Sequence, residues 1–223
     1  MIKIENTETY GWQAAVRGMR NPMNSWEQSD SYFFDFYESA HINLKEELLP
    51  CVPDHNEEVY LGTKDLNLMK RLVKAGTDHS KFMRMLTVTC DITAPLYWWK
   101  EFDTYKVGTV RNSCSTMHKI HAKEFTYDDF SHEHCNGFIG GIIDTLNAWR
   151  EQFNNTKDKE YWYAIIQLLP SSYNQKATVQ LNYAVLRNMY HSRKNHKLDE
   201  WHTLCDWIER LPYSELITGE NNE

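Results

Sequence analysis

The sequence of 223 residues lacks the marks of a membrane or secreted protein. It has no run of about 18 apolar residues, which a membrane-spanning helix needs. Its start, from Met1 to Glu5, lacks the basic-then-apolar order of a signal peptide. Its five cysteines, an odd number at wide and unpatterned spacings, favour reduced thiols over a disulfide framework. We therefore expect a cytoplasmic protein that contacts no membrane.

The sequence also lacks an excess of positive charge and a metal-binding pattern. Its 24 Lys and Arg against 31 Asp and Glu give a formal net charge of −7. An extended nucleic-acid groove is disfavoured, because tracking phosphates needs a basic surface, whereas a local basic pocket for one small anion stays open. His132, Glu133, His134 and Cys135 have the donor types of a zinc site, but no second ligand pair follows at zinc spacing. We expect no metal.

The sequence has no repeats, no low-complexity tract and no obvious linker. Its 41% hydrophobic and 13% aromatic residues are enough for one packed core. We therefore predict a single domain over residues 1–223, with a flexible tail from about 212 to 223. Residues 24–54, aromatic and acidic, receive no assigned role.

Hydrophobic periodicity predicts many helices and few strands. Residues 86–92 alternate between apolar and polar side chains, the pattern of a strand with one buried face. Apolar residues at helical spacing between Thr63 and Val73, followed by Gly76, predict a helix that the glycine ends. An edge strand is expected at residues 1–4, a Pro-started helix just after the alternating strand, and further helices at 10–19, 126–153, 161–169, 177–193 and 198–211. The fold class is therefore α+β.

The segment from Trp98 to Asn112 holds the strongest polar constellation. Thr104, Thr109 and Arg111, with Lys100 and Lys106 nearby, are groups that hold a phosphate or carboxylate. The alternative is a solvated loop in which Arg111 pairs with Asp103.

The aromatic residues of this segment divide by helical spacing. Trp98 and Phe102 stand one helical turn apart, which favours the core, whereas Trp99 falls on another face and is able to stack on a planar base.

Two further side chains are candidate reactive groups. Cys114 lies three residues after Arg111, and a cation there would lower the thiol pKa and favour a nucleophile; a buried structural thiol is the alternative. His79, next to Ser80, is either an acid/base group or a cap after Gly76.

Two blocks of the sequence resemble one enzyme family. Gly76, His79-Ser80 and Phe82 come before a strand and a helix, and then Thr104, Thr109 and Arg111 follow. This order resembles the flavin-dependent thymidylate synthases of the ThyX type, whose motif reads Arg-His-Arg-x-x-Ser-x-Asn-Glu-x-Ser-x-Arg. The two serines of the motif fall on Thr104 and Thr109, and its last arginine falls on Arg111.

The second block begins at Leu169-Pro170. Asn182, Leu186, Asn188 and Arg193 come after it at the intervals of a family helix that reads Asn-x-Arg-x-Leu-x-Asn-x-x-x-x-Arg. With both blocks, the resemblance covers most of the chain from about Thr63 to Arg210.

The resemblance implies a ThyX-like fold, a small mainly antiparallel sheet with long helices, and a one-carbon transfer. Family enzymes move a methylene group from methylenetetrahydrofolate to deoxyuridylate (dUMP) with electrons from reduced FAD, which NADPH supplies. They are homotetramers with sites between subunits. By resemblance, the pyrimidine nucleotide is held by Thr104, Thr109, Arg111 and Arg193, the catalytic groups are Arg193, Glu101 and His79, and the cofactor contacts are Trp99, Lys100, Asn182 and Asn188.

The sequence departs from the family mainly at the flavin positions. Arg-His-Arg becomes Trp99-Lys100-Glu101, and the helix arginine two residues after Asn182 becomes Ala184. A carboxylate at Glu101 would repel the diphosphate of FAD. Two hypotheses remain: a divergent enzyme that acts on a pyrimidine nucleotide, or a non-catalytic or flavin-free nucleotide-binding or interaction protein that kept the fold.

Overall fold

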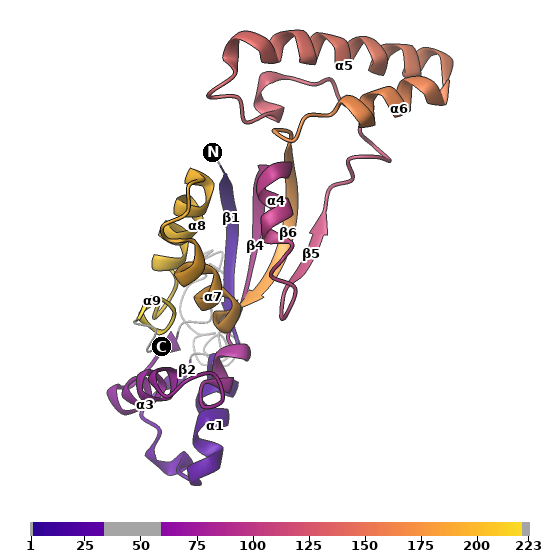
Figure 1. Cartoon of the computed structure of the whole chain (residues 1–223). Helices are drawn as coiled ribbons and strands as arrows, with labels where there is room; N and C mark the ends of the chain where they lie inside the picture. Colours follow the sequence, from indigo (N-terminus) through magenta and orange to yellow (C-terminus); the bar gives the residue numbers. More distant parts are fainter. Residues whose placement is uncertain (1, 34–58, 220–223) are drawn as a thin grey trace, which may run out of the picture. The chain divides into compact units, whose positions relative to one another are not determined.

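The computed structural model describes residues 2–33 and 59–219, so Cys51 and most of the unassigned segment 24–54 lie outside the described residues (Figure 1). The chain divides into two compact units, each described by itself below. The first comprises Met1–Glu5, Asp91–Lys106 and Arg111–Val179, and the second comprises Asn6–Cys90, Val107–Val110 and Gln180–Glu223. The predicted single domain stays a prediction.

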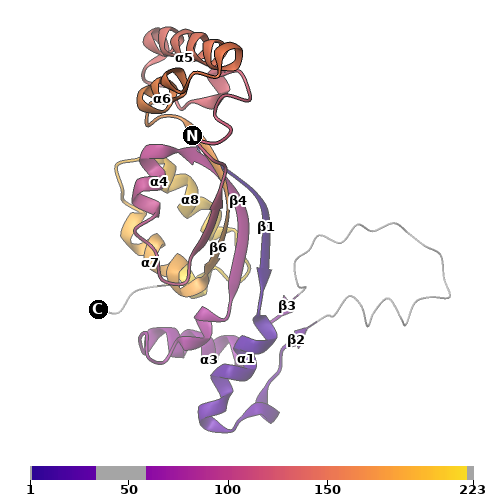
Figure 2. The ribbon, with the colours of Figure 1, turned by 90° about the vertical axis from the view of Figure 1, so that its right-hand side faces the viewer.

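The fold is α+β, as the sequence predicts, with a small mainly antiparallel sheet and long helices. The sheet has the order β1-β4-β6-β5, and three of these strands are seen next to one another in Figure 2. Its strands are β1 (Lys3–Tyr10), β4 (Thr87–Pro95), β5 (Val110–Ser113) and β6 (Asn174–Asn182). A second sheet pairs β2 (Tyr32–Phe33) antiparallel with β3 (Val59–Tyr60). The helices are α1 (Trp12–Arg20), α3 (Thr63–Lys74), α4 (Leu96–Phe102), α5 (Asn136–Thr156), α6 (Lys159–Leu168), α7 (Tyr183–Arg193), α8 (Asp199–Glu209) and α9 (Glu215–Thr218).

Strand β4 confirms the alternating pattern of the sequence. From Thr87 to Ala94 every second side chain is buried, namely Val88, Cys90, Ile92 and Ala94. Pro95 then ends the strand and precedes α4, because proline fits the start of a helix but cannot donate to a sheet ladder. The two elements that lead to Arg111 are therefore local consequences of the sequence.

The helix predicted over residues 177–193 is wrong in its first part. Residues 174–182 form β6, because Ala177, Val179 and Leu181 alternate and are buried, which is a strand period. Asp91 of β4 accepts a hydrogen bond from Thr178 at 2.6 Å and pairs with Lys176 at 3.0 Å. The helix α7 begins only after these residues.

The helix predicted from Thr126 begins ten residues later, at Asn136. Thr126 does cap a turn, but a short one: its side chain and that of Asp129 form a capping box around the 3₁₀ helix η4 (Tyr127–Asp129). The predicted start of the long helix is therefore wrong, since a capping box marks the start of a helical turn and does not set its length.

The first unit has its core between α5 and α6, which lie side by side (Figure 1). The core residues come from both helices and from the segment before them: Ile120, Phe125, Phe130, Ile139, Ile143, Leu146 and Ile165. Trp98 and Phe102 of α4 are also buried, as predicted.

The second unit has its core around α7, which packs against α8, α9 and the 3₁₀ helix η3 (Lys81–Arg84). Leu216 and Ile217 of α9 are fully buried, and Arg187 donates to the carbonyls of Ile217 and Gly219, each at 2.8 Å. Residues 212–219 therefore do not form the loose tail that the polar composition predicts, because two apolar side chains tie them to the core. Residues 220–223 lie outside the described residues.

Neither a membrane-spanning helix nor a metal cluster is found in the described ranges. No helix in residues 2–33 and 59–219 has the length and apolarity to cross a membrane. The same ranges hold no group of three or more His, Cys, Asp and Glu side chains arranged to bind a metal ion.

Candidate functional site

Arg111 of β5 is the centre of a polar cluster in the first unit. Its Nη1 donates to both carboxylate oxygens of Asp103, at 2.8 and 2.7 Å. Its Nη2 donates to Oε1 of Gln175 at 2.5 Å, and the guanidinium carbon lies 4.0 Å from the ring centroid of Trp99. Three side chains therefore hold the guanidinium in one orientation.

Trp99 forms the apolar wall of this cluster. It is 2% exposed, and its ring lies edge-on to Trp98 and Phe102 on the same helix. Its Nε1 donates to the backbone carbonyl of Gln175 at 3.0 Å. The side chain predicted to stack on a base or flavin is thus packed in the protein with Arg111 near its ring, and a cation over an indole face is a favourable pair.

Gln175 is the residue that sequence reasoning missed. It is 8% exposed, and its Nε2 donates to the carbonyl of Cys114, so its amide links β6 to the segment after β5 while it holds Arg111. A signal was present: Gln175 shares the alternation phase of Ala177, Val179 and Leu181. A polar side chain at a buried position of a strand usually has a specific partner.

The pairing of Arg111 with Asp103, which the solvated-loop alternative predicts, is present. An arginine has five N–H donors, and the cluster uses those of Nη1 and one of Nη2. The Nε atom is buried and has no hydrogen-bond partner among the described residues. The Asp103 side chain is 52% exposed, so the ion pair is accessible to solvent and to a competing anion.

The other predicted site residues of the first unit lie at the end of α4 and after β5. Lys100 is exposed and Glu101 half-buried, and the hydroxyl of Thr104 donates to the carbonyl of Glu101 at 2.7 Å. Cys114 is an exposed free thiol, so the buried alternative for it is wrong.

The remaining predicted site residues belong to the second unit. The hydroxyl of Thr109 is buried and has no partner among the described residues. Arg193, the last residue of α7, lies with its guanidinium carbon 4.6 Å from the ring centroid of Trp201. His79 is exposed in the turn after α3, where its backbone N–H donates to the carbonyl of Gly76. The predicted joint pocket of Arg111 and Arg193, which belong to different units, stays a prediction.

Of the two asparagines of the second block, Asn182 ends β6 and caps α7, and Asn188 lies on α7. Oδ1 of Asn182 accepts from the N–H of Val185 at 2.9 Å and caps the helix, and its Nδ2 lies 3.4 Å from the carbonyl of Gly108. Asn188 is exposed and accepts from Ser192 at 3.4 Å. The amide of Asn182 is therefore engaged in the protein's own structure, and that of Asn188 is open to solvent.

The fold defines a class of protein with known structures. No protein-family model matches the sequence, and no curated protein matches it. Solved structures do match: a flavin-dependent thymidylate synthase ThyX from Helicobacter pylori, complexed with FAD and dUMP, has 15% identity and a TM-score of 0.69, and the match covers 98% of both chains. A second structure of ThyX from Helicobacter pylori, also with FAD and dUMP, has 14% identity and a TM-score of 0.70 over 99% of this chain and 98% of that one. At these identities the likeness establishes the fold.

Proposed function

We propose that this chain is a divergent ThyX-like enzyme that binds a pyrimidine deoxynucleotide monophosphate, of the dUMP type, and transfers a one-carbon unit to it. The proposal includes a homotetramer with sites between subunits, in the cytoplasm. Its support is the fold likeness over nearly the whole of both chains, together with the order of Thr104, Thr109, Arg111 and Arg193 along the sequence.

The single observation that supports nucleotide binding is the orientation of the Arg111 side chain. Gln175, Asp103 and Trp99 hold its guanidinium on three sides, and a side chain that is already ordered loses less entropy when it binds an anion. A phosphate with two negative charges competes well with the half-exposed carboxylate of Asp103, because exposed ion pairs contribute only about 0–1 kcal/mol.

The other residues of the proposed site would complete the nucleotide contacts. The hydroxyls of Thr104 and Thr109 would donate to the phosphate, and Arg193 would polarise a carbonyl of the base. Glu101 and His79 would move protons.

The residues at the four cofactor positions fit FAD only in part. Trp99 and Asn182 are engaged in internal packing and capping, whereas Lys100 and Asn188 are exposed and remain open to a ligand. FAD, reduced by NADPH, would supply the electrons for a transfer from methylenetetrahydrofolate.

The same observations favour a second candidate function, a flavin-free nucleotide-binding or interaction protein with this fold. Burial of Trp99 removes one expected flavin contact, and Glu101 places a carboxylate where the family has a cation. The two candidates share the nucleotide site and differ in the cofactor.

The test is calorimetric titration of the purified protein with dUMP, together with its visible absorption spectrum. Replacing Arg111 with Ala should weaken dUMP binding by about tenfold or more, because a charge-assisted hydrogen bond contributes about 1.5–3 kcal/mol. Lys119→Ala removes the same charge from an exposed position of the same unit and should leave binding unchanged. Undiminished binding in Arg111→Ala would show that the phosphate binds elsewhere.

The spectrum and an assay separate the two candidates. A flavin absorption band, together with deoxythymidylate formed from dUMP, methylenetetrahydrofolate and NADPH, supports the enzyme. A colourless protein that binds dUMP and forms no product supports the flavin-free candidate.

A further inference from the structure

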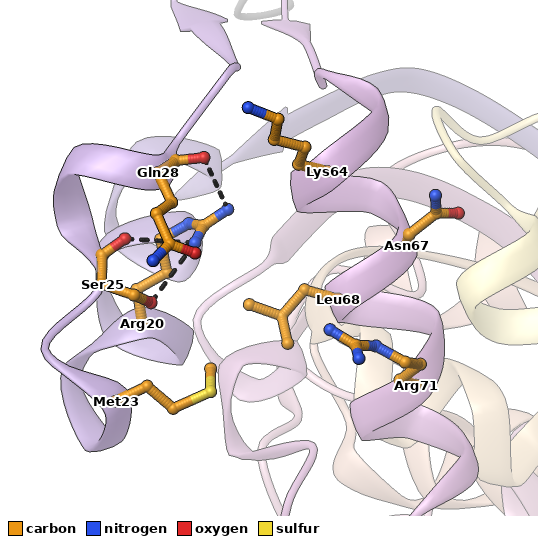
Figure 3. Close-up of a pocket in the computed structure, with 8 residues that line it drawn as sticks. All are labelled: Arg20, Met23, Ser25, Gln28, Lys64, Asn67, Leu68 and Arg71. Atoms are coloured by element: carbon orange, nitrogen blue, oxygen red, sulfur yellow. Dashed lines mark hydrogen bonds between the residues drawn. The ribbon is translucent and has the colours of Figure 1, made fainter.

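A cavity of about 400 Å³ lies in the second unit, between α3 and the segment that runs from the end of α1 through two short 3₁₀ helices, η1 (Asn21–Met23) and η2 (Trp26–Gln28) (Figure 3). Pockets for organic ligands range from about 300 to 1,000 Å³, so the volume of this one suits an organic ligand and is larger than a bare inorganic ion requires. None of its lining residues belongs to the proposed nucleotide site. We call it the α1–α3 pocket.

Two cations of α3 face this pocket. Lys64 and Arg71 are seven residues apart, about two helical turns, so they lie on the same face of the helix with Leu68 between them. In Figure 3 both side chains extend toward the opposite wall, which carries Met23 and Gln28. No ion pair of Lys64 or Arg71 is present within the described residues. Among the described residues, therefore, no ion pair neutralises either charge, and the nearby carboxylate of Asp30 accepts from the backbone N–H of Lys64 at 2.9 Å and forms no ion pair with its ammonium group.

Arg20, the third cation of the lining, contributes no net charge. It is 3% exposed and pairs with the fully buried Asp65, with Nε and Nη2 each 2.6 Å from one carboxylate oxygen. Its Nη1 donates to the carbonyl of Ser25 at 3.1 Å, and its Nη2 donates to that of Gln28, also at 3.1 Å. Arg20 thus connects the segment from Ser25 to Gln28 with Asp65 of α3, and its charge is neutralised. Lys64 and Arg71 leave a surplus of two positive charges among the lining residues.

We propose that the α1–α3 pocket binds a small organic phosphate monoester. A phosphate monoester carries about −1.5 to −2 charge at neutral pH, which matches the surplus of Lys64 and Arg71. The planar guanidinium of Arg71 would bind two phosphate oxygens, and Lys64 would act as a point charge. The apolar side chains of Leu68 and Met23 would contact the organic part of the ligand.

The experiment uses phenyl phosphate as the probe and phenol as its uncharged match, by calorimetric titration of the full chain. The background is Arg111→Ala, so that the proposed nucleotide site does not contribute. The double variant Lys64→Gln/Arg71→Gln should weaken binding by about tenfold or more. The matched control, Lys74→Gln/Lys81→Gln, removes two exposed charges outside the pocket and should bind as its parent does. Glutamine is a good helix former, so α3 should persist in the variants, and circular dichroism checks this.

Each outcome decides the proposal. A loss confined to Lys64→Gln/Arg71→Gln supports it, and phenol should not bind in any variant. Equal losses in both double variants would mean a diffuse response to surface charge and would overturn it. Absence of binding in the Arg111→Ala background, with binding in the unmodified protein, would overturn it as well, while it would support the phosphate role of Arg111.

Discussion

Arg20 and Arg111 show how burial decides what an arginine does. The Arg20 side chain is 4% exposed, and its guanidinium donates to the carbonyls of Ser25 and Gln28 and to the fully buried Asp65. The Arg111 side chain is 17% exposed, and its partner Asp103 is 52% exposed. A buried pair loses several kilocalories per mole when one partner goes, whereas an exposed pair exchanges its partner at little cost. Arg20 is therefore structural, and Arg111 is suited to bind a ligand.

The first prediction concerns the buried pair. Asp65→Asn should lower the free energy of unfolding by about 3–5 kcal/mol, because it leaves the Arg20 charge buried and uncompensated. Asp103→Asn is the matched change at the exposed pair and should lower it by less than about 1 kcal/mol. Urea denaturation of the two variants measures the difference. Equal effects would contradict the assignment of Asp65 as a structural group.

The second prediction is the pH dependence of this pair. Burial alone would raise the pKa of Asp65, but hydrogen bonds from Ser31, Ser29, Arg20 and the backbone of Asp30 outweigh it and lower the pKa below the ordinary value of 3.8. Because the folded pKa lies below the unfolded one, the stabilisation is fully present above the unfolded value and is lost as the pH falls through the folded value.

Denaturation at a series of pH values tests this dependence. The unmodified protein should lose stability as the pH falls below 3.8, and Asp65→Asn should lose less over the same interval. Parallel pH profiles for the two proteins would show that other carboxylates control the acid limit.

At the scale of elements, the boundary between β6 and α7 carries the second block of the family motif. Asn182 ends the strand and caps the helix, so one side chain sets where the alternating period stops and the helical period begins. The predicted helix merges the two elements because no Gly or Pro marks a boundary between residues 177 and 193, although the alternation at 177, 179 and 181 has the period of a strand. Local periodicity was sufficient for α3 and β4, because each carries a single period from end to end.

The third prediction tests this cap. Asn182→Ala should lower the free energy of unfolding by about 1 kcal/mol, because the N–H of Val185 loses its acceptor. Asn182→Asp keeps an oxygen at that position and should cost less, although both variants lose the weak contact with the carbonyl of Gly108. Chemical denaturation of the two variants compares them; an equal loss would assign the effect to the Gly108 contact instead.

At the scale of the whole molecule, the strands β4 and β6 each contribute residues to both compact units. A strand cannot unfold at one end without losing hydrogen-bond partners along its ladder, so we expect the units to unfold together. A single domain should show such cooperative unfolding.

The fourth prediction is one cooperative unfolding transition, with equal calorimetric and van't Hoff enthalpies. Leu146 in the first unit and Leu204 in the second are both fully buried. Changing either to Ala should lower the free energy of unfolding by about 2–5 kcal/mol and so lower the midpoint temperature of that one transition. Differential scanning calorimetry measures both variants. Two transitions, of which each variant moves only one, would show that the units are independent domains.

The sequence by itself determined the elements that carry one uninterrupted period, the α+β class and the order of residues that resembles ThyX, because these depend on neighbours along the chain. It also singled out Arg111 and offered Asp103 as its partner, only eight residues away. Tertiary structure alone decided that Gln175 orients Arg111, which lies 64 residues earlier in the sequence, and that Asp65 neutralises Arg20, which lies 45 residues earlier. It also decided that Leu216 and Ile217 are buried. The reason is that hydrogen-bond partners and burial depend on which distant segments pack together, and local spacing does not encode that choice.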